Sequence, residues 1–350
     1  MTTKTKPLLI TMGDAAGIGP EIIAKAFRDS PAEMAGCVVV GDVATMRRAS
    51  ALAAQAAGTL ALPVAQLNCL ADLDSVPPSC IGVLQECELP APVPYGLVSN
   101  LAGKAAAECI VWAARAVLAG EAAAMVTAPI HKEALAAAGG WVAGFPGHTE
   151  MLQAEAAAYL GKPISEVPVR MMLANDELKT VLVSIHMSLK RAIEAVTFDN
   201  VLQTLRITHR AVSASLGRAP RIAVAGLNPH AGEGGLFGSE EQLIIAPAIA
   251  AARAEGLDVH GPFAPDTVFM RARNTANKPG EFDVVVAMYH DQGLIPVKYL
   301  GVEQGVNVTL GLPLVRTSPD HGTAFDIAGT GRADASSLLA AIRMARQLAV

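Results

Sequence analysis

Three histidines stand directly after apolar runs that have the length and composition of buried strands. His186 follows "VLVSI", His230 follows "IAVAGLNP" and His290 follows "VVVAMY". Ligands of open α/β sheets bind outside the carboxyl ends of the strands, so a polar residue in this place is a site candidate. One such histidine is more often a hydrogen-bonded structural residue. Three of them favour a divalent-metal site, because imidazole is the commonest protein metal ligand and three leave coordination positions open for substrate oxygens.

Two other segments carry groups that bind anions or move protons. A fourth apolar run ends in "TAPIHK", which offers Thr127, His131 and Lys132. In "GFPGHTE", His148 and Thr149 stand between a Pro-Gly turn and the helical stretch "MLQAEAAAYL". Backbone N–H groups at a helix start bind anions, so these two side chains predict an anion pocket. The alternative is that Thr149 serves as the N-cap of the helix.

Two glycine-rich segments suggest nucleotide binding, but their spacing does not support it. "MGDAAGIGPE" has the spacing G-x-x-x-G-x-G, which is neither the Rossmann fingerprint nor a P-loop. "NPHAGEGGLFG" fits neither template, and we interpret its glycines as allowing a tight backbone path around His230. Ser239 and Gln242 match a capping box, which predicts a helix after this loop. Pro247 is expected to kink that helix or to delay its start.

The elements that must position these residues alternate along the chain. The apolar runs are "PLLIT", "CVVVGD", "AAMVTAP", "KTVLVSIH", "RIAVAGLNPH" and "FDVVVAMYH", and stretches with helical periodicity lie between them. This alternation is typical of βαβ units and a largely parallel sheet. One helix is expected from Pro20, with Glu21 near its positive dipole end. Because single hydrophobic cores stop growing at roughly 250 to 300 residues, a chain of 350 residues predicts two lobes.

Composition excludes several classes of function. The net charge of −5, with basic residues scattered along the chain, argues against binding to nucleic acid. No apolar run reaches the roughly 18 residues of a membrane span, and the first apolar run is too short for the core of a signal peptide. The five cysteines form no C-x-x-C pair and are expected to be reduced thiols. We therefore expect a cytoplasmic protein with no nucleic-acid or membrane partner.

Six motifs, in order along residues 11 to 331, carry a family resemblance. They are "GDAAGIGPE", "TAPIHK", "FPGHTE", "NPHAGEGGLFG", "YHDQGLIPVKY" and "VNVTLGLPLVRTSPDHGTAFDIAGTG". The chain resembles the 4-hydroxythreonine-4-phosphate dehydrogenase family and its close paralogues. The resemblance implies a two-lobed α/β/α fold with largely parallel sheets, similar to isocitrate and isopropylmalate dehydrogenases. It also implies a homodimer with shared active sites. We expect a first, cofactor-side lobe at 1–130 plus 300–350, and a second lobe with metal ligands and dimer interface at 131–299.

The resemblance also assigns roles to individual residues. The metal (zinc, magnesium or cobalt) would be bound by His186, His230 and His290. A small phosphorylated substrate would be bound by His148, Thr149, Lys298, Asn307 and Arg316. The cofactor would lie near His321, Gly322, Thr323, Ala324 and Asp326. Because the Asp326 carboxylate favours a ribose hydroxyl over a 2'-phosphate, NAD is preferred to NADP.

These groups fit the oxidation of a secondary alcohol. The hydroxyl proton must leave and the alkoxide must be stabilised while hydride departs, and a divalent metal serves both needs. The β-keto acid formed can then lose carbon dioxide. Lys298 or Asp266 could relay protons, and Asp266 and Asp291 could orient histidine ligands. For Asp266, a helix cap is the alternative.

Several substrates and two other classes of function stay open. Paralogues oxidise 4-phospho-D-threonate or 4-phospho-D-erythronate, and "YGLVSNLAGKAAAECI" is similar to that group. Paralogues that act on a terephthalate dihydrodiol lack "GHTE", so this motif favours a phosphorylated substrate. A metal-dependent aldolase or hydrolase would use the same histidines without nicotinamide. A phosphosugar-binding protein would need no metal.

Overall fold

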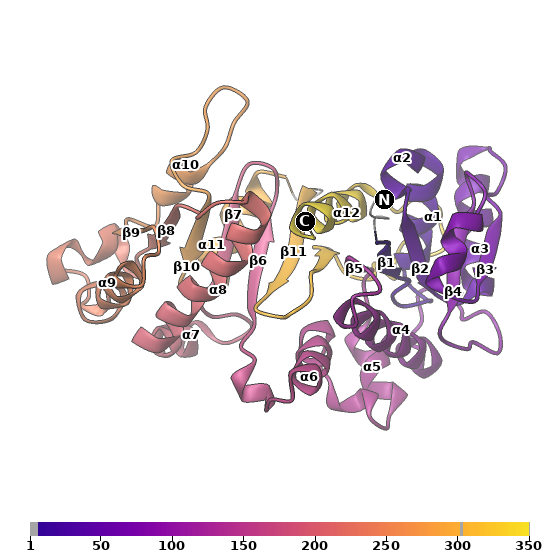
Figure 1. Ribbon diagram of the computed structural model, residues 1–350, viewed down its shortest axis with the longest axis horizontal. Helices are drawn as coiled ribbons and strands as arrows, with labels where there is room; N and C mark the ends of the chain where they lie inside the picture. Colours follow the sequence, from indigo (N-terminus) through magenta and orange to yellow (C-terminus); the bar gives the residue numbers. More distant parts are fainter. Residues whose placement is uncertain (1–5, 302–303, 350) are drawn as a thin grey trace. The chain divides into compact units, whose positions relative to one another are not determined.

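The computed structural model describes residues 6–301 and 304–349, which fall into two compact units (Figure 1). Unit 1 comprises the chain up to Pro168 together with Leu312–Ala349, and unit 2 comprises Val169–Gly311. Each unit is a sheet packed with helices, which confirms the α/β class. The unit boundaries differ from the predicted lobes at both ends of unit 2, because residues 131–168 belong to unit 1 and the segment before Leu312 belongs to unit 2. Helices α5 (Lys132–Ala138) and α6 (His148–Leu160) both pack against α4 (Asn100–Leu118), a helix of that unit.

Unit 1 is built on six parallel strands. Their order is β3 (Val64–Leu67), β4 (Ile81–Gln85), β2 (Cys37–Gly41), β1 (Leu8–Thr11), β5 (Ala124–Thr127), β12 (Arg316–Pro319). Its other helices are α1 (Gly19–Asp29), α2 (Pro31–Met34), α3 (Val43–Ala57) and α12 (Ser336–Leu348). Strands β1, β2 and β5 are buried along their whole length. These three strands carry polar groups at their ends, whereas β12 carries buried polar side chains along its length.

Unit 2 is built on a mixed sheet of six strands. Their order is β11 (Val306–Leu310), β6 (Arg170–Ala174), β7 (Lys179–Leu182), β10 (Val284–Ala287), β8 (Ile222–Ala225), β9 (Val259–Phe263). Pairing is antiparallel from β11 to β7 and parallel from β7 to β9. Its helices are α7 (Leu189–Ala195), α8 (Phe198–Leu216), α9 (Ala246–Ala254), α10 (Val268–Ala272) and α11 (His290–Tyr299). The carboxyl ends of β7, β10 and β8 thus lie side by side at one edge.

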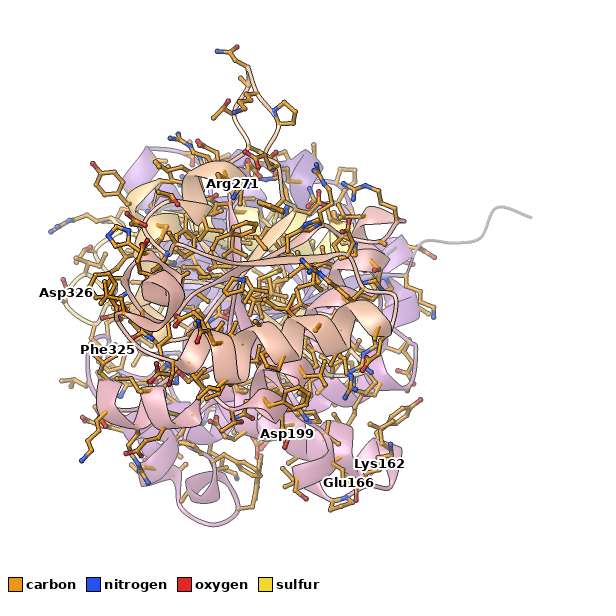
Figure 2. The ribbon with its side chains drawn as sticks, turned by 90° about the vertical axis from the view of Figure 1, so that its left-hand side faces the viewer. Lys162, Glu166, Asp199, Arg271, Phe325 and Asp326 are labelled. Atoms are coloured by element: carbon orange, nitrogen blue, oxygen red, sulfur yellow. The ribbon has the colours of Figure 1, made fainter. Side chains whose placement is uncertain are left out.

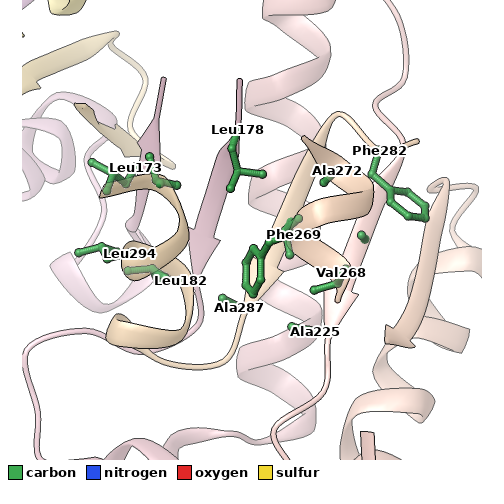
Figure 3. Packing of buried hydrophobic residues seen from close by; sticks show 13 residues of the cluster. Leu173, Leu178, Leu182, Ala225, Val268, Phe269, Ala272, Phe282, Ala287 and Leu294 are labelled. Carbon is green, nitrogen blue, oxygen red and sulfur yellow. The ribbon is translucent and has the colours of Figure 1, made fainter. Parts of the chain in front are cut away.

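A buried apolar cluster fixes these three strands. Leu182, Phe269 and Leu294 lie in it, and they come from β7, α10 and α11 (Figure 3). Because α10 and α11 pack on the strands through these side chains, the strand ends are held in one register. The loops that follow the three strands start from fixed points.

Most local expectations are confirmed. All six apolar runs form strands, and α1 carries Pro20 at its start with Glu21 in its first turn. The prediction of a capping box at Ser239 is wrong, because no side chain caps the helical segment that follows. A π-helical turn, Glu241–Ile245, comes first, and α9 begins only at Ala246 with Pro247 in its first turn, as expected of a proline that delays a helix. Within residues 6–301 and 304–349, no helix combines the length and the apolar character that crossing a bilayer requires.

Candidate active site

The ends of β7 and β10 bring two of the predicted histidines together. The ring centres of His186 and His290 lie 5.8 Å apart, with an angle of 44° between the ring planes. Both rings line one cavity of about 430 Å³, together with Ser184, Tyr289 and Asp291. Two imidazoles that share one metal ion, each with a nitrogen about 2.1 Å from it, have ring centres roughly 5–6 Å apart. The spacing of this pair therefore fits a metal ion.

The third histidine lies on an unusual turn. From His230 to Gly234 every residue has a positive φ, and His230 itself has φ +52°. His186 also has a positive φ, +45°. This conformation costs a non-glycine residue of order 1 kcal/mol or more, and such residues cluster at functional sites. Two of the three predicted ligands thus occupy backbone conformations that need support from their surroundings.

His230 lines a second cavity, of about 640 Å³, next to the first. Asp266 also lines it, and Tyr289 and Asp291 line both cavities. The structure does not bring His230 into contact with the other pair: among the described residues, no three His, Cys, Asp or Glu side chains gather as a metal site. The structure thus places His186 and His290 beside each other and His230 in the adjoining cavity, and their role as metal ligands stays a prediction.

Both predicted partner carboxylates are in place to act on histidines. His290 Nδ1 lies 2.7 Å from Asp291 Oδ1, so Nε2 is the ring nitrogen that this contact does not use. Asp266 shares the cavity of His230. The alternative that Asp266 caps a helix is wrong, because the N-cap of α10 is Thr267 and no side chain donates or accepts there.

Unit 1 carries a separate cationic group at the end of its sheet. Arg316, on β12, is only 4% exposed, and its Nε and Nη2 donate to Thr127 Oγ1 at 3.0 and 2.7 Å. Burial lowers its pKa to about 10, so the guanidinium remains charged at neutral pH. A buried guanidinium is a group suited to a carboxylate or phosphate.

His148 and Thr149 begin a helix beside this charge. His148 is the first residue of α6 and Thr149 the second, while the N-cap is Gly147, so the alternative that Thr149 is the N-cap is wrong. Burial and then the charge of Arg316 hold the pKa of His148 well below 6.5. Its Nε2 is shielded from solvent and has no hydrogen-bond partner among the described residues. A neutral imidazole, a helix start and a guanidinium are groups that can bind an anion, and the anion pocket itself stays a prediction.

The predicted cofactor segment lies on the first glycine loop. Ile18 N donates to Thr323 O at 3.0 Å, and a Cβ at Gly17 would lie 2.9 Å from the Thr323 Cβ. The glycines of "MGDAAGIGPE" therefore permit close packing against this segment. This packing explains the presence of glycines whose spacing matches no phosphate-binding template. His321 Nδ1 lies 3.0 Å from the Gly322 carbonyl oxygen, and its Nε2 is buried without a described partner.

The rest of the segment reaches the surface. Ala324 has φ +42°, and it is followed by Phe325 and by the exposed Asp326, which lie beside each other in Figure 2. Phe325 stacks on the ring of His131, with ring centres 4.5 Å apart. An exposed carboxylate beside a stacked aromatic pair is a suitable place for a ribose hydroxyl.

Two other predicted substrate residues are not among those that line these two cavities. Lys298 is near the end of α11, and Asn307 is on β11, opposite Leu173 of β6. Neither side chain lines a cavity that holds a predicted histidine. The assignment of these two residues to the substrate stays a prediction.

Asp14 is a polar residue that the sequence analysis did not select. It is fully buried, its Oδ1 accepts from Ala16 N at 2.8 Å, and its Oδ2 has no described partner. Burial raises its pKa. His131 Nδ1 is likewise buried without a described partner. The rule that selected the histidines, a polar residue soon after an apolar run, applies equally to "LLITMGD".

Comparisons with known proteins agree with the motifs. The family model described as "Pyridoxal phosphate biosynthetic protein PdxA" matches residues 33–345. A 4-hydroxythreonine-4-phosphate dehydrogenase of Beijerinckia indica is 52% identical over 346 residues, which are 98% of this chain and 95% of that protein. A D-threonate 4-phosphate dehydrogenase of Pectobacterium atrosepticum is 43% identical, over 99% of this chain and 100% of that protein. The crystal structure of a 4-hydroxythreonine-4-phosphate dehydrogenase from Klebsiella pneumoniae is 41% identical, with a TM-score of 0.85 over 100% of this chain and 99% of that one.

Proposed function

We propose a function for this chain from its family: it belongs to the PdxA family, and its relatives in the comparisons are dehydrogenases. The proposed function is that of an NAD-dependent and metal-dependent enzyme that acts on a 4-phosphorylated hydroxy acid. The proposed substrate is 4-phosphohydroxy-L-threonine, because the 4-hydroxythreonine-4-phosphate dehydrogenase of Beijerinckia is more similar to this chain (52% identity) than the D-threonate 4-phosphate dehydrogenase of Pectobacterium (43%). The observation that carries the proposal is the pair of His186 and His290 rings, 5.8 Å apart.

The reaction is an oxidation followed by loss of carbon dioxide. The substrate hydroxyl would lose its proton and the carbon that bears it would lose a hydride, which leaves a ketone β to a carboxylate. The bond to that carboxylate then breaks, carbon dioxide departs, and the electron pair left behind takes up a proton. When bound, a divalent metal would polarise the hydroxyl and stabilise developing negative charge, while NAD would accept the hydride.

The residues of unit 2 hold the metal and move the protons. His186, His230 and His290 are the proposed ligands, and Asp291 keeps the His290 ring oriented through its 2.7 Å contact. Asp266 lines the cavity of His230 and is the proposed proton carrier there. Lys298 is the second candidate for this role.

The residues of unit 1 bind the charged parts of the substrate and the cofactor. Arg316 supplies a buried positive charge, and His148 and Thr149 supply neutral donors at the start of α6. Asn307 and Lys298 of unit 2 complete the proposed substrate contacts. The proposed NAD site is formed by His321, Gly322, Thr323, Ala324 and Asp326. Asp326 favours NAD, because its carboxylate repels a 2'-phosphate.

A sugar-acid phosphate is the second candidate substrate, because of the similarity to a D-threonate 4-phosphate dehydrogenase. The D-threonate 4-phosphate dehydrogenase of Pectobacterium is 43% identical over almost the whole of both chains. Oxidation of 4-phospho-D-threonate or 4-phospho-D-erythronate would use the same anion pocket and the same histidines. A homodimer with shared active sites and a cytoplasmic location are part of the same proposal.

The decisive experiment measures NADH at 340 nm with 4-phosphohydroxy-L-threonine, 4-phospho-D-threonate and 4-phospho-D-erythronate, with and without a chelator. We expect turnover of the first that the chelator abolishes and added Zn²⁺, Mg²⁺ or Co²⁺ restores. His290→Ala should lose activity, while His260→Ala, a histidine on β9 outside both cavities, should keep it.

Three results would redirect the proposal. Turnover of a sugar-acid phosphate alone would move the chain to the second substrate. Metal-dependent cleavage of phosphosugars without any response to NAD would favour an aldolase or hydrolase. Phosphosugar binding that survives chelation, with no turnover of any substrate, would favour a binding protein.

A further inference from the structure

The predicted cofactor segment, residues 321–333, connects β12 to α12 without forming a helix or a strand of its own. Its backbone turns, with positive φ at Ala324, Gly329 and Gly331. Turns make fewer backbone hydrogen bonds than a helix or a strand does, so contacts with the surroundings must help to fix the shape of this segment.

Helix α1 holds the segment at two places. Ile18 N, just before the helix, donates to Thr323 O at 3.0 Å. Farther along the helix, Lys25 Nζ donates to Gly331 O at 2.7 Å and to Ala333 O at 2.6 Å. Both ends of the segment are therefore attached to the same helix, and all of these residues belong to unit 1.

Glu21 completes the second attachment. Its Oε1 accepts from Ala333 N at 2.9 Å and lies 3.1 Å from Lys25 Nζ. Glu21 is 2% exposed and Lys25 is 8% exposed. An ammonium group has three N–H donors, and three acceptors surround this one. A buried ion pair adds little stability by itself, because the cost of removing both charges from water offsets their attraction.

The middle of the segment carries the groups proposed for NAD. Asp326 is exposed beside Phe325, which stacks on the ring of His131 (Figure 2). A Cβ added to Gly329 would run into the ring of Tyr95, so the backbone packs directly on that ring. Apolar packing limits where the backbone can lie, whereas the direction of its carbonyl groups is set by hydrogen bonds, which α1 supplies at both ends.

We propose that Lys25 and Glu21 are positioning residues, which hold the cofactor segment from α1 in the shape that binds NAD. The inference rests on the proposed NAD site and goes beyond it, since neither side chain is proposed to touch the cofactor. Without the ammonium group, two carbonyl groups of the segment lose their donor and Glu21 loses its counter-charge. The segment then spends less time in its binding shape, and the apparent Kd for the dinucleotide rises as that fraction falls.

The experiment measures NADH binding to the purified chain by the fluorescence of the bound dinucleotide, with no substrate present. Lys25→Met removes the charge and keeps the length of the side chain. It should weaken NADH binding about 10-fold, as expected of a segment that holds its binding shape about a tenth of the time. Lys104→Met is the matched control, because Lys104 of α4 also pairs with a glutamate four residues away, Glu108 at 3.5 Å, but is 59% exposed. This variant should bind NADH as the wild type does.

Hydrogen–deuterium exchange tests whether the effect is local. In Lys25→Met, the amides of residues 321–333 should exchange faster than in the wild type, while those of β1 and β5 keep their protection. Saturating NADH should restore protection in the segment, because binding favours its ordered shape. Faster exchange throughout unit 1 would indicate a general loss of stability and would overturn the positioning role.

The binding results separate this inference from the proposed function. An unchanged NADH affinity in Lys25→Met would overturn the inference and leave the proposed NAD site standing. A wild-type chain that binds no NADH would overturn the proposed NAD site and the inference with it. If Lys25→Met does not fold because Glu21 is left as an unpaired buried charge, the double variant Glu21→Gln/Lys25→Met decides in its place, since it leaves no charge unpaired. NADH binding by that variant with wild-type affinity would also overturn the inference.

Discussion

The two units place their functional groups in different ways. In unit 1, Arg316 lies within a strand and His148 begins a helix, so regular backbone and burial fix both side chains. In unit 2, His186 and His230 lie on loops and have positive φ values of 45° and 52°. The proposed anion site of unit 1 therefore lies on regular elements, whereas two of the three proposed metal ligands, His186 and His230, lie on loops and only His290 begins a helix.

This difference has an energetic reason. An anion pocket needs charge and donors in a dry place, which a strand end and a helix start supply without backbone strain. A metal site needs three rings to converge on one point, and adjacent parallel strands alone keep their ends about 4.8 Å apart in a row. Loops that turn sharply can place a ring off this row, but such a loop requires support, as the loop of His230 has from the hydrogen bonds of Gln292 and Glu241.

The largest effect on activity should come from a substitution in unit 1, where regular elements hold the functional side chains. We expect Arg316→Met to reduce kcat/KM by 10²- to 10³-fold, mostly through KM, because a charge-assisted contact to the substrate is lost. Arg316→Lys should recover part of the loss, since an ammonium keeps the charge but not the planar fork. Steady-state kinetics with the phosphorylated substrate test both variants.

The two units should respond independently in that experiment. Co²⁺ affinity of Arg316→Met should equal that of the wild type, because Arg316 lies in unit 1 and the three histidines lie in unit 2. A parallel fall in metal affinity and kcat/KM would contradict this separation. It would mean that one structural change, rather than the loss of one contact, explains the kinetics.

A smaller effect is expected from the carboxylate beside His290. Asp291→Asn should weaken metal binding about 10- to 100-fold, because the amide no longer accepts from Nδ1 with a full negative charge. The KM for the phosphorylated substrate, measured at saturating metal, should change little. Unchanged metal affinity would show that the 2.7 Å contact has no orienting role.

Much of this arrangement could be predicted from the sequence, because it depends on patterns in consecutive residues. Six apolar runs mark six strands, and the rule that ligands bind at strand ends selects His186 and His290, whose rings the structure brings together. The strands that escaped notice are no shorter than the others, but each carries polar residues, as does β12, whose sequence is RTSP. Their pairing partners decide that they are strands.

The shape of the His230 turn could not be predicted in this way. The glycines in "HAGEGG" predict a tight turn. The positive φ of His230, Ala231 and Glu233, however, goes with contacts to residues farther along the chain. One of these is Glu241, which reaches back 14 residues to Leu227. Local propensity instead suggested a capped helix at Ser239, where a π-helical turn forms, since the buried Glu241 must face the loop.

Two glycines of this turn test how much it depends on Glu241. Gly232 and Gly234 both have positive φ, +79° and +66°. A Cβ at Gly232 meets the Glu241 carboxylate, whereas one at Gly234 meets nothing within 4 Å. Gly234→Ala should therefore destabilise the chain by about 1 kcal/mol, the backbone cost alone, and Gly232→Ala by roughly 2–3 kcal/mol.

Denaturant unfolding and Co²⁺ binding distinguish the two variants. Gly232→Ala should lose metal affinity as well as stability, and Gly234→Ala should keep most of its affinity. Equal effects of the two substitutions on both quantities would indicate that only the backbone conformation matters. The contact with Glu241 would then have no separate part in shaping the turn.

The smallest effect concerns acid stability and comes from unit 1. Because the pKa of His148 is held well below 6.5 in the folded chain, the unfolded chain binds a proton near pH 6.5 that the folded chain does not. Above pH 6.5 the imidazole is neutral in both states and this effect is absent, whereas below pH 6.5 proton binding stabilises the unfolded state and the folded chain loses stability. The wild-type Tm should consequently drop by a few degrees more than that of His148→Gln between pH 7.5 and pH 5. Identical slopes of Tm against pH would mean that His148 is protonated in the folded chain, and the neutral imidazole proposed for the anion pocket would then have to be replaced by a second positive charge beside Arg316.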